Sequence, residues 1–342
     1  HSPTGKNLQS YDAESFPKCS SDAEECGTRC MSVISSPGFA GIEFCSLGRL
    51  FEESNFKKEY MKYKGADATE YLPDTSDEII GAVRSLVRNW CTIKNKDYGT
   101  IGRDFVKRLH DEVFATDEMI QELRNDVAKT AERLWTCAAR FGGANGSELC
   151  SLISQTLTGD REELVKPVAK LFRSLNTRLV SRPQDANNPA LFPEGGILYR
   201  GGAIASNHLN FYRQMLRTST RKFRVPPALA TAFREQTAKG FLARAWRHHQ
   251  DNGNNRPGVM FKIQVDPRGE NDPNFLCKNV NYLTKTLVGD EFEYLFAPYS
   301  VFTIDRFEES SDPNYTTPHV IYLTASLDNL LEPAGLPLAP RV

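Results

Sequence analysis

Apolar residues follow three different patterns along the chain, and these patterns divide it into three stretches. Residues 1–47 lack an apolar period and are rich in Ser, Gly, Pro and Cys, so we expect an irregular N-terminal segment there. Between 48 and 186 apolar residues recur every three or four positions, which predicts a helical lobe. From 187 to 342 short apolar runs alternate with turn residues, which predicts a β-rich lobe. Helices followed by loop-separated strands favour an α+β fold over a doubly wound parallel sheet.

Three long helices are expected in the helical lobe. Thr75-Ser76-Asp77-Glu78 fits a capping box at the start of the first. Thr116 opens a second long helix, and Asp160 and Glu163 begin a third, in which Pro167 is expected to introduce a kink. The second helix carries one apolar stripe, formed by Ile120, Leu123, Val127, Ala131 and Leu134.

The β-rich lobe begins after a polar linker with prolines near both ends, residues 182–189. One helix is expected within it, over 233–247. The predicted strands, each bounded by turn residues, are 196–199, 259–265, 292–296, 301–307 and 319–323.

Composition narrows the choice of partners. Of the 342 residues 40% are hydrophobic and 25% charged, as in ordinary soluble globular proteins. The net charge of −1 predicts no general attraction to nucleic acid. A run of about 18 apolar residues, which a membrane-spanning helix needs, is absent from the sequence. We expect a monomer without a nucleic-acid partner or a membrane span.

Eight cysteines leave the compartment open between two readings. Four of them precede residue 46 in the irregular segment, where disulfides would stabilise most, and this favours a secreted protein, either extracellular or delivered as an effector. The alternative is a cytoplasmic protein with reduced thiols packed in its core. A zinc site is disfavoured because the early cysteines contain no C-x-x-C pair. The chain begins with His1 and not Met, which we interpret as a trimmed or mature form. The cysteines are Cys19, Cys26, Cys30, Cys45, Cys91, Cys137, Cys150 and Cys277.

Two glutamates one residue apart carry the candidate chemistry. Side chains alternate along a strand, so Glu291 and Glu293 are expected on one face and Tyr294 in the core. A fixed carboxylate stabilises the positive charge that develops on a ribose when its glycosidic bond is cleaved. About ninety residues earlier, Arg200 at the end of a strand offers a planar donor fork for a phosphate, and Gly201 would let the ligand approach closely. The alternative for each charged residue is an ordinary surface or structural role.

Three motifs in order give the chain a specific resemblance. They are Leu198-Tyr199-Arg200-Gly201-Gly202, then Ala230-Thr231-Ala232-Phe233 leading into a helix, then Glu291-Phe292-Glu293-Tyr294-Leu295-Phe296. The chain resembles mono-ADP-ribosyltransferases of the arginine-serine-glutamate class, which includes cholera-like and clostridial C2-like toxins and vertebrate ecto-enzymes. The resemblance covers roughly residues 75–325. It implies a helical lobe followed by a mostly antiparallel two-sheet core, with NAD as substrate and no metal.

The resemblance also implies roles for individual residues. Glu293 would contact the ribose, Arg200 and Gly201 would hold NAD together with Thr231, and Glu291 would orient the guanidinium of a target arginine and help to accept its proton. Tyr282 would contact the target protein, although a packed loop aromatic is the equal alternative.

Phe233 would stack near nicotinamide or pack against the core. The middle motif departs from the family's Ser-Thr-Ser, because Ala230 and Ala232 cannot form the hydrogen bond of a serine hydroxyl.

The resulting hypothesis is an enzyme that transfers ADP-ribose from NAD to arginine side chains of a protein, with release of nicotinamide. Two alternatives are kept: an NAD glycohydrolase that uses water as acceptor, and a catalytically weakened NAD-binding module. A glycine-rich dinucleotide fingerprint and a P-loop are absent from the sequence, so NAD would not be held in the Rossmann manner. His248-His249 are expected on a solvated helix face and not at a metal.

Overall fold

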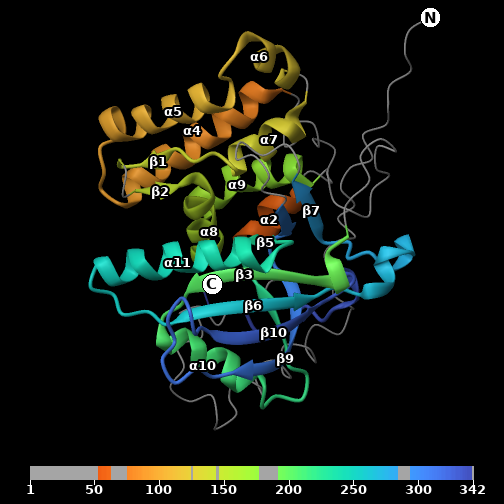
Figure 1. The fold of residues 1–342 in the computed structure, drawn as a ribbon. Coiled ribbons are helices and arrows are strands. Elements are labelled where there is room, and N and C mark those ends of the chain that lie inside the picture. Colours follow the sequence, from red (N-terminus) through yellow and green to blue (C-terminus); the bar gives the residue numbers. More distant parts are fainter. Residues whose placement is uncertain are drawn as a thin grey trace, which may run out of the picture.

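Two layers make up the molecule, with helices of the N-terminal half above a twisted sheet formed by the C-terminal half (Figure 1). The computed structural model describes residues 53–62, 75–124, 126–143, 146–176, 192–283 and 293–340. The predicted irregular segment 1–47 with its four cysteines, the linker 182–189 and Glu291 lie outside the described residues. Within them, the structure confirms the α+β class.

Short and medium helices form the helical lobe. The capping box predicted at Thr75 is confirmed. Helix α4 begins at Ser76, and the side chain of Thr75 accepts a hydrogen bond from the Glu78 main-chain N–H. The two-stranded sheet β1–β2 was not expected from the helical pattern. The elements are α2 (Asn55–Met61), α4 (Ser76–Ile93), a π-helical turn (Tyr98–Gly102), α5 (Arg103–Val113), α6 (Asp117–Leu123), α7 (Val127–Trp135), β1 (Arg140–Phe141), β2 (Ser147–Glu148), α8 (Leu149–Gly159) and α9 (Glu162–Leu175).

The single long helix predicted from Thr116 is wrong, because two helices, α6 and α7, occupy this stretch. Asp126 interrupts the helix: it takes a non-helical conformation, and its carboxylate accepts from the Lys129 N–H as the N-cap of α7. The carbonyl of Leu123, at the end of α6, accepts from the hydroxyls of Ser76 and Thr130. Local capping therefore overrides a continuous apolar stripe.

Pro167 lies inside α9, which runs through it from Glu162 to Leu175. A proline removes the hydrogen bond to the carbonyl four residues earlier. That carbonyl, on Glu163, accepts instead from the Asn89 side-chain amide at 2.7 Å. The neighbouring helix thus satisfies the group that Pro167 leaves without its helical donor.

Asp160 does not begin the third helix, as the sequence had suggested, but ends α8 in the left-handed region with φ 48°. Its carboxylate accepts from the main-chain N–H groups of Asn55 at 2.8 Å and Phe56 at 2.9 Å. These N–H groups belong to the first turn of α2, which has no acidic residue of its own there. A buried side chain of one helix terminus therefore caps another helix.

Eight strands of the described residues form one hydrogen-bonded sheet in the order β4-β9-β10-β6-β3-β5-β8-β7. Neighbouring strands are antiparallel except β10 and β6. Strands β3 and β5 pair only at Tyr199 and Ala232, so the sheet is joined there at a single position and behaves as two parts. The strands are β3 (Ile197–Ala203), β4 (Lys222–Val225), β5 (Leu229–Ala232), β6 (Gly258–Gln264), β7 (Val280–Leu283), β8 (Glu293–Phe296), β9 (Ser300–Glu308) and β10 (His319–Ala325).

The five predicted strands are confirmed with shifts of one to four residues at their ends, as is the helix predicted over 233–247, now α11 (Glu235–Asp251). Helix α10 (Ser206–Met215) and the strands β4 and β7 were not expected from the sequence pattern. Helix α11 lies along β3 in the picture, between the sheet and the helical lobe (Figure 1).

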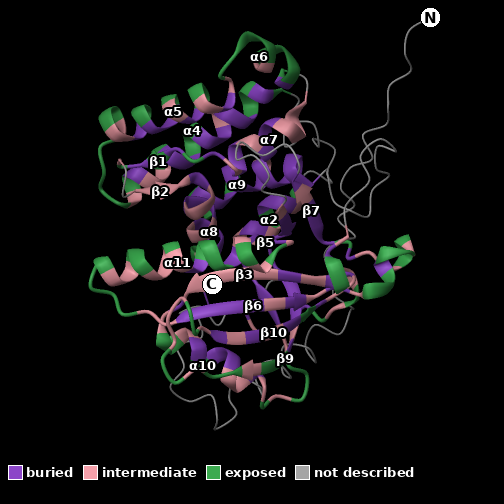
Figure 2. Ribbon diagram, viewed as in Figure 1, coloured by how far each residue is buried: buried purple, intermediate pink, exposed green. Residues whose placement is uncertain are grey.

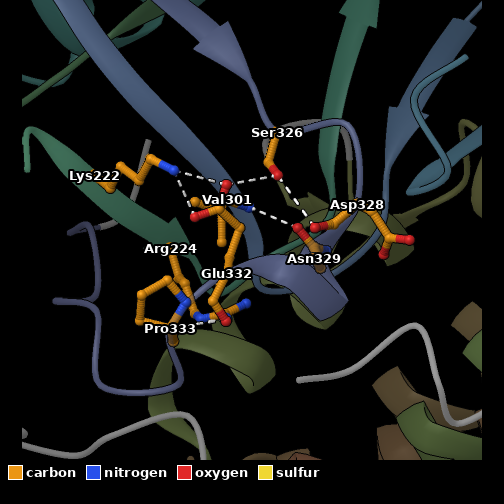
Figure 3. Close-up of polar contacts among 8 residues, drawn as sticks. All are labelled: Lys222, Arg224, Val301, Ser326, Asp328, Asn329, Glu332 and Pro333. Atoms are coloured by element: carbon orange, nitrogen blue, oxygen red, sulfur yellow. Dashed lines mark hydrogen bonds and ion pairs between the residues drawn. The ribbon is translucent and has the colours of Figure 1, made fainter. Parts of the chain in front are cut away.

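Residues 332–339 form a C-terminal segment that covers β4, which is one edge of the sheet. The main chain of Arg224 exchanges hydrogen bonds of 2.8 and 2.7 Å with this segment. The fully buried Arg224 guanidinium also donates to the carbonyl of Pro333 at 3.0 Å, and Lys222 forms an ion pair with Glu332 at 2.7 Å (Figure 3). The segment thereby occupies an edge that would otherwise be open to another chain.

Two large apolar cores hold the layers together, and buried residues run from the helices into the sheet (Figure 2). One core lies among the helices but also includes Leu283 and Leu295 from β7 and β8. The other lies on the opposite face of those strands and includes Tyr294 and Phe296. In the part of the chain that the structure describes, no helix is both long and apolar enough to cross a membrane.

Replacing Asp160 should destabilise the fold. In Asp160→Ala, two N–H groups of α2 lose their acceptor and a side chain with a Cβ stays in the left-handed region, so we expect the free energy of unfolding in urea to fall by about 2–4 kcal/mol. Asp160→Asn keeps one side-chain oxygen and tolerates this conformation, and should cost about 1 kcal/mol. Equal losses in the two variants would contradict the capping role.

Candidate active site

Glu293 is the first residue of β8 and is half-buried. It lies directly opposite Ala232 of β5 on one side and Leu283 of β7 on the other. Opposed residues of antiparallel strands project from the same face, so Glu293 shares a face with Leu283 and Leu295. Those leucines belong to the core of the helical lobe. The carboxylate therefore faces the helical lobe.

The helical lobe contacts this carboxylate directly. The indole Nε1–H of Trp135 donates to Oε1 of Glu293 at 3.2 Å. Trp135 is the last residue of α7, is only 4% exposed, and packs against Phe172 of α9 with ring centroids 5.9 Å apart. A buried indole N–H needs an acceptor, so the sequence alone indicates that a buried Trp135 has a hydrogen-bond partner. Nothing in the sequence identifies Glu293 as that partner.

Cys150, in the first turn of α8, interacts electrostatically with the Glu293 carboxylate. Burial, and to a lesser extent the negative charges of Glu148 and Glu293, raise the pKa of its thiol to about 12. The residue keeps some exposed surface, yet its sulfur is enclosed by protein atoms. Cys150 is therefore a neutral thiol beside Glu293 and not a nucleophile.

Arg200 follows Tyr199 on β3. Tyr199 is opposite Ala232 and so shares the face of Glu293, whereas Arg200 is opposite Phe261 and leaves the strand on the other face of the sheet. Its guanidinium crosses to β5, where Nη1 donates to the carbonyl of Ala230 at 2.8 Å. Glu293 stands on β8, the strand that pairs with β5. One strand thus separates the guanidinium from the strand that carries the carboxylate.

The middle motif forms β5 between these two groups. Ala230 and Ala232 lie on the face of Glu293, and neither can offer a side-chain hydrogen bond. Thr231 is buried, and its hydroxyl donates to the carbonyl of Tyr294 at 2.5 Å. The structure therefore places the Thr231 hydroxyl against the β8 main chain.

Gly201 has a structural reason to be glycine. A Cβ at this position would overlap the carbonyl oxygen of Ala238 and the side chain of Leu242, both on α11. Gly202, by contrast, has open space at the Cβ position. The first glycine allows the helix to lie close on β3, and the second leaves the strand surface accessible.

Phe233 and Tyr282 lie together with Tyr294 in an aromatic cluster. The ring of Phe233 is 5.6 Å from that of Tyr282 and 5.3 Å from that of Tyr294. Tyr282 belongs to β7, a strand where a loop was expected, and burial raises the pKa of its hydroxyl to about 12. Tyr282 is opposite Tyr294 and therefore projects from the other face of the sheet than Glu293.

A metal has no evident place in the described residues, which contain no group of three or more His, Cys, Asp or Glu able to hold one. His248 and His249 lie near the end of α11, with ring centroids 5.6 Å apart. Chemically, Glu293 offers an anion held by a neutral donor, and Arg200 offers a cation one strand away. An anion suits a cationic reacting carbon and a guanidinium suits a phosphate, but strand alternation starts these two side chains from opposite faces of the sheet.

Comparison with known proteins finds similarity in solved structures alone. No family model matches the sequence, and no curated protein matches it significantly. Similar structures include the ADP-ribosyltransferase Vis of Vibrio splendidus, with 16% identity, 73% of this chain and 85% of that chain covered, and a TM-score of 0.38. The ADP-ribosyltransferase HopU1 of Pseudomonas syringae has 14% identity, coverage of 66% and 87%, and a TM-score of 0.39.

The type III effector XopAI of Xanthomonas axonopodis is similar over 85% of this chain and 99% of that chain, with 12% identity and a TM-score of 0.44.

The environment of Cys150 can be tested by alkylation. Because the pKa of its thiol is raised to about 12, the thiolate fraction at pH 8.5 should be roughly three orders of magnitude below that of an ordinary thiol. We expect its iodoacetamide labelling, followed by peptide mass spectrometry, to rise steadily between pH 7.5 and 9.5. The same cysteine in the urea-unfolded chain is the control and should level off near pH 9, whereas a plateau in the folded protein would contradict the raised pKa.

Proposed function

We propose that the protein transfers ADP-ribose from NAD to an arginine side chain of a target protein and releases nicotinamide. The observation that supports this most is the placement of Glu293 and Arg200 on the two strands that flank β5. Cleavage of the nicotinamide–ribose bond generates positive charge on the ribose, and the Glu293 carboxylate is suited to stabilise it.

Arg200 is assigned to the diphosphate of NAD. A guanidinium carries five N–H donors, so its bond to the Ala230 carbonyl is compatible with further donation to phosphate oxygens. Its half-buried position strengthens such contacts, because the effective dielectric constant there is below that of water. Gly202, with open space at the Cβ position, is suited to close approach of the ligand to the strand.

Glu291 is assigned to the acceptor. A target arginine is protonated at ordinary pH and must lose a proton as its nitrogen attacks carbon, so a nearby carboxylate would orient the guanidinium and help to accept that proton. The target is then a protein with an accessible arginine. The even number of cysteines supports, within the same proposal, a protein that is secreted or delivered as an effector.

The assignment of Glu293 is tested by Glu293→Gln. This substitution keeps the shape and removes the charge, so we expect kcat for nicotinamide release from NAD to fall by about 10²–10³-fold. Glu309→Gln is the matched control, because Glu309 is an exposed carboxylate that pairs with Arg213. Chromatography quantifies nicotinamide, and equal rates for the wild type and Glu293→Gln would end this assignment.

The acceptor is tested separately with biotin-labelled NAD and a mixture of candidate proteins. We expect label on protein arginines, located by mass spectrometry, and its loss in Glu291→Gln, while nicotinamide release continues, because Glu291 acts on the acceptor alone. Release of nicotinamide by the wild type without any labelled protein would assign water as the acceptor. Absence of both release and label would leave a non-catalytic module.

A further inference from the structure

We infer that Trp135 is the residue that positions the Glu293 carboxylate, so that a helix of the helical lobe completes the active site. The inference rests on the proposed function for the reaction, but the contact itself can be tested without any activity. Trp135 donates to Oε1 of Glu293 at 3.2 Å across 158 positions of sequence.

The sheet around Glu293 supplies no side-chain donor from its two directly opposed residues. Those residues are Ala232 and Leu283, whose side chains contain no polar atom. Ala230, on the same face of β5, is equally apolar. A glutamate at the start of a strand has several rotamers, and its neighbours in the sheet cannot select among them by hydrogen bonding. The indole of Trp135 is a donor to this carboxylate from outside the sheet.

Trp135 is suited to that task because it is itself fixed. It is 4% exposed, its ring packs on Phe172, and α7 packs on α9. An indole presents one N–H in the plane of a rigid ring, and here the acceptor is an anion, which strengthens the bond. The orientation of the carboxylate is thus set by the apolar core of the helical lobe.

The contact is compatible with substrate binding. A carboxylate has two oxygens with about four acceptor positions, so Glu293 can accept from Trp135 and from a ribose hydroxyl at the same time. Unlike a lysine or arginine, the indole is neutral and does not itself cancel the negative charge of Glu293. Glu293 is therefore oriented without losing the charge that the reaction uses.

The contact is tested first without substrate, by nuclear magnetic resonance of the indole N–H groups. The chain has three tryptophans, Trp90, Trp135 and Trp246, so ¹⁵N labelling gives three indole signals. Trp135→Phe identifies its signal by loss. We expect Glu293→Gln to shift the Trp135 signal and leave the other two in place, and Glu309→Gln to shift none. A Trp135 signal that Glu293→Gln does not move would overturn the inference.

The positioning role is tested by kinetics. Trp135→Phe keeps most of the ring and removes the donor, so we expect kcat for nicotinamide release to fall about tenfold, which equals about 1.4 kcal/mol of barrier. KM for NAD should stay within about twofold, since the interaction orients the carboxylate and does not bind the rest of NAD. Trp90→Phe is the matched control in the same lobe, where Trp90 packs 4.9 Å from Phe141, and should leave kcat unchanged. An unchanged kcat in Trp135→Phe would refute the positioning role.

Rescue separates a lost donor from a disturbed fold. Ala232 is directly opposite Glu293, so Ala232→Ser brings a hydroxyl to the carboxylate from within the sheet. We expect Trp135→Phe/Ala232→Ser to regain most of the lost kcat, and Trp90→Phe/Ala232→Ser to gain nothing comparable. A double variant as slow as Trp135→Phe would show that the lost group was not needed as a donor. If the wild type releases no nicotinamide, the proposed function fails, and the indole signals alone decide on the contact.

Discussion

The single pairing of Tyr199 with Ala232 is the constraint on which the arrangement of the site depends. It joins two parts of one sheet. Within each part, neighbouring strands pair along several residues, as β3 does with β6 and β5 does with β8. With so little pairing between β3 and β5, the Arg200 guanidinium can satisfy the carbonyl of Ala230, a main-chain group on β5. At the junction of β3 and β5, a side-chain hydrogen bond therefore replaces main-chain pairing. This bond holds the Arg200 guanidinium at β5, the strand that pairs with the strand of Glu293.

The helical lobe is part of the site and not an appendage. Its apolar core includes Leu283 and Leu295, which flank Glu293 on β7 and β8, so separating the lobe from the sheet would expose apolar surface together with the carboxylate. Two of its helices contribute: Trp135 on α7 donates a hydrogen bond to Glu293, and the charge of Glu293 contributes to the raised pKa of Cys150 on α8. The packing of helices thereby sets the electrostatic environment of a strand residue. Under the proposed function, substitutions deep in the lobe would change turnover without touching a substrate.

Local patterns were sufficient for much of the fold and for the charged members of the site. Period-two alternation over 292–296 located β8, which begins at Glu293, and the capping box located α4. The errors arose where a local interaction opposed the periodic pattern, as at Asp126 and Asp160, whose carboxylates cap helices. Such competition between side-chain capping and helix propagation depends on contacts that periodicity alone does not weigh.

Long-range contacts account for what could not be predicted about the site. Gly201 was assigned to ligand approach, whereas the structure also requires it for the contact with α11, which only the packed fold reveals. Trp135 directly follows Leu134, the last residue of the predicted apolar stripe, and the stripe gave it no role. Its role emerges because residues 232 and 283, its alternatives as neighbours of Glu293, are apolar. Where the opposed side chains of a sheet are apolar, an element packed on that face can supply a donor, as Trp135 does for Glu293, and the packing of the whole fold then determines the geometry of a single side chain.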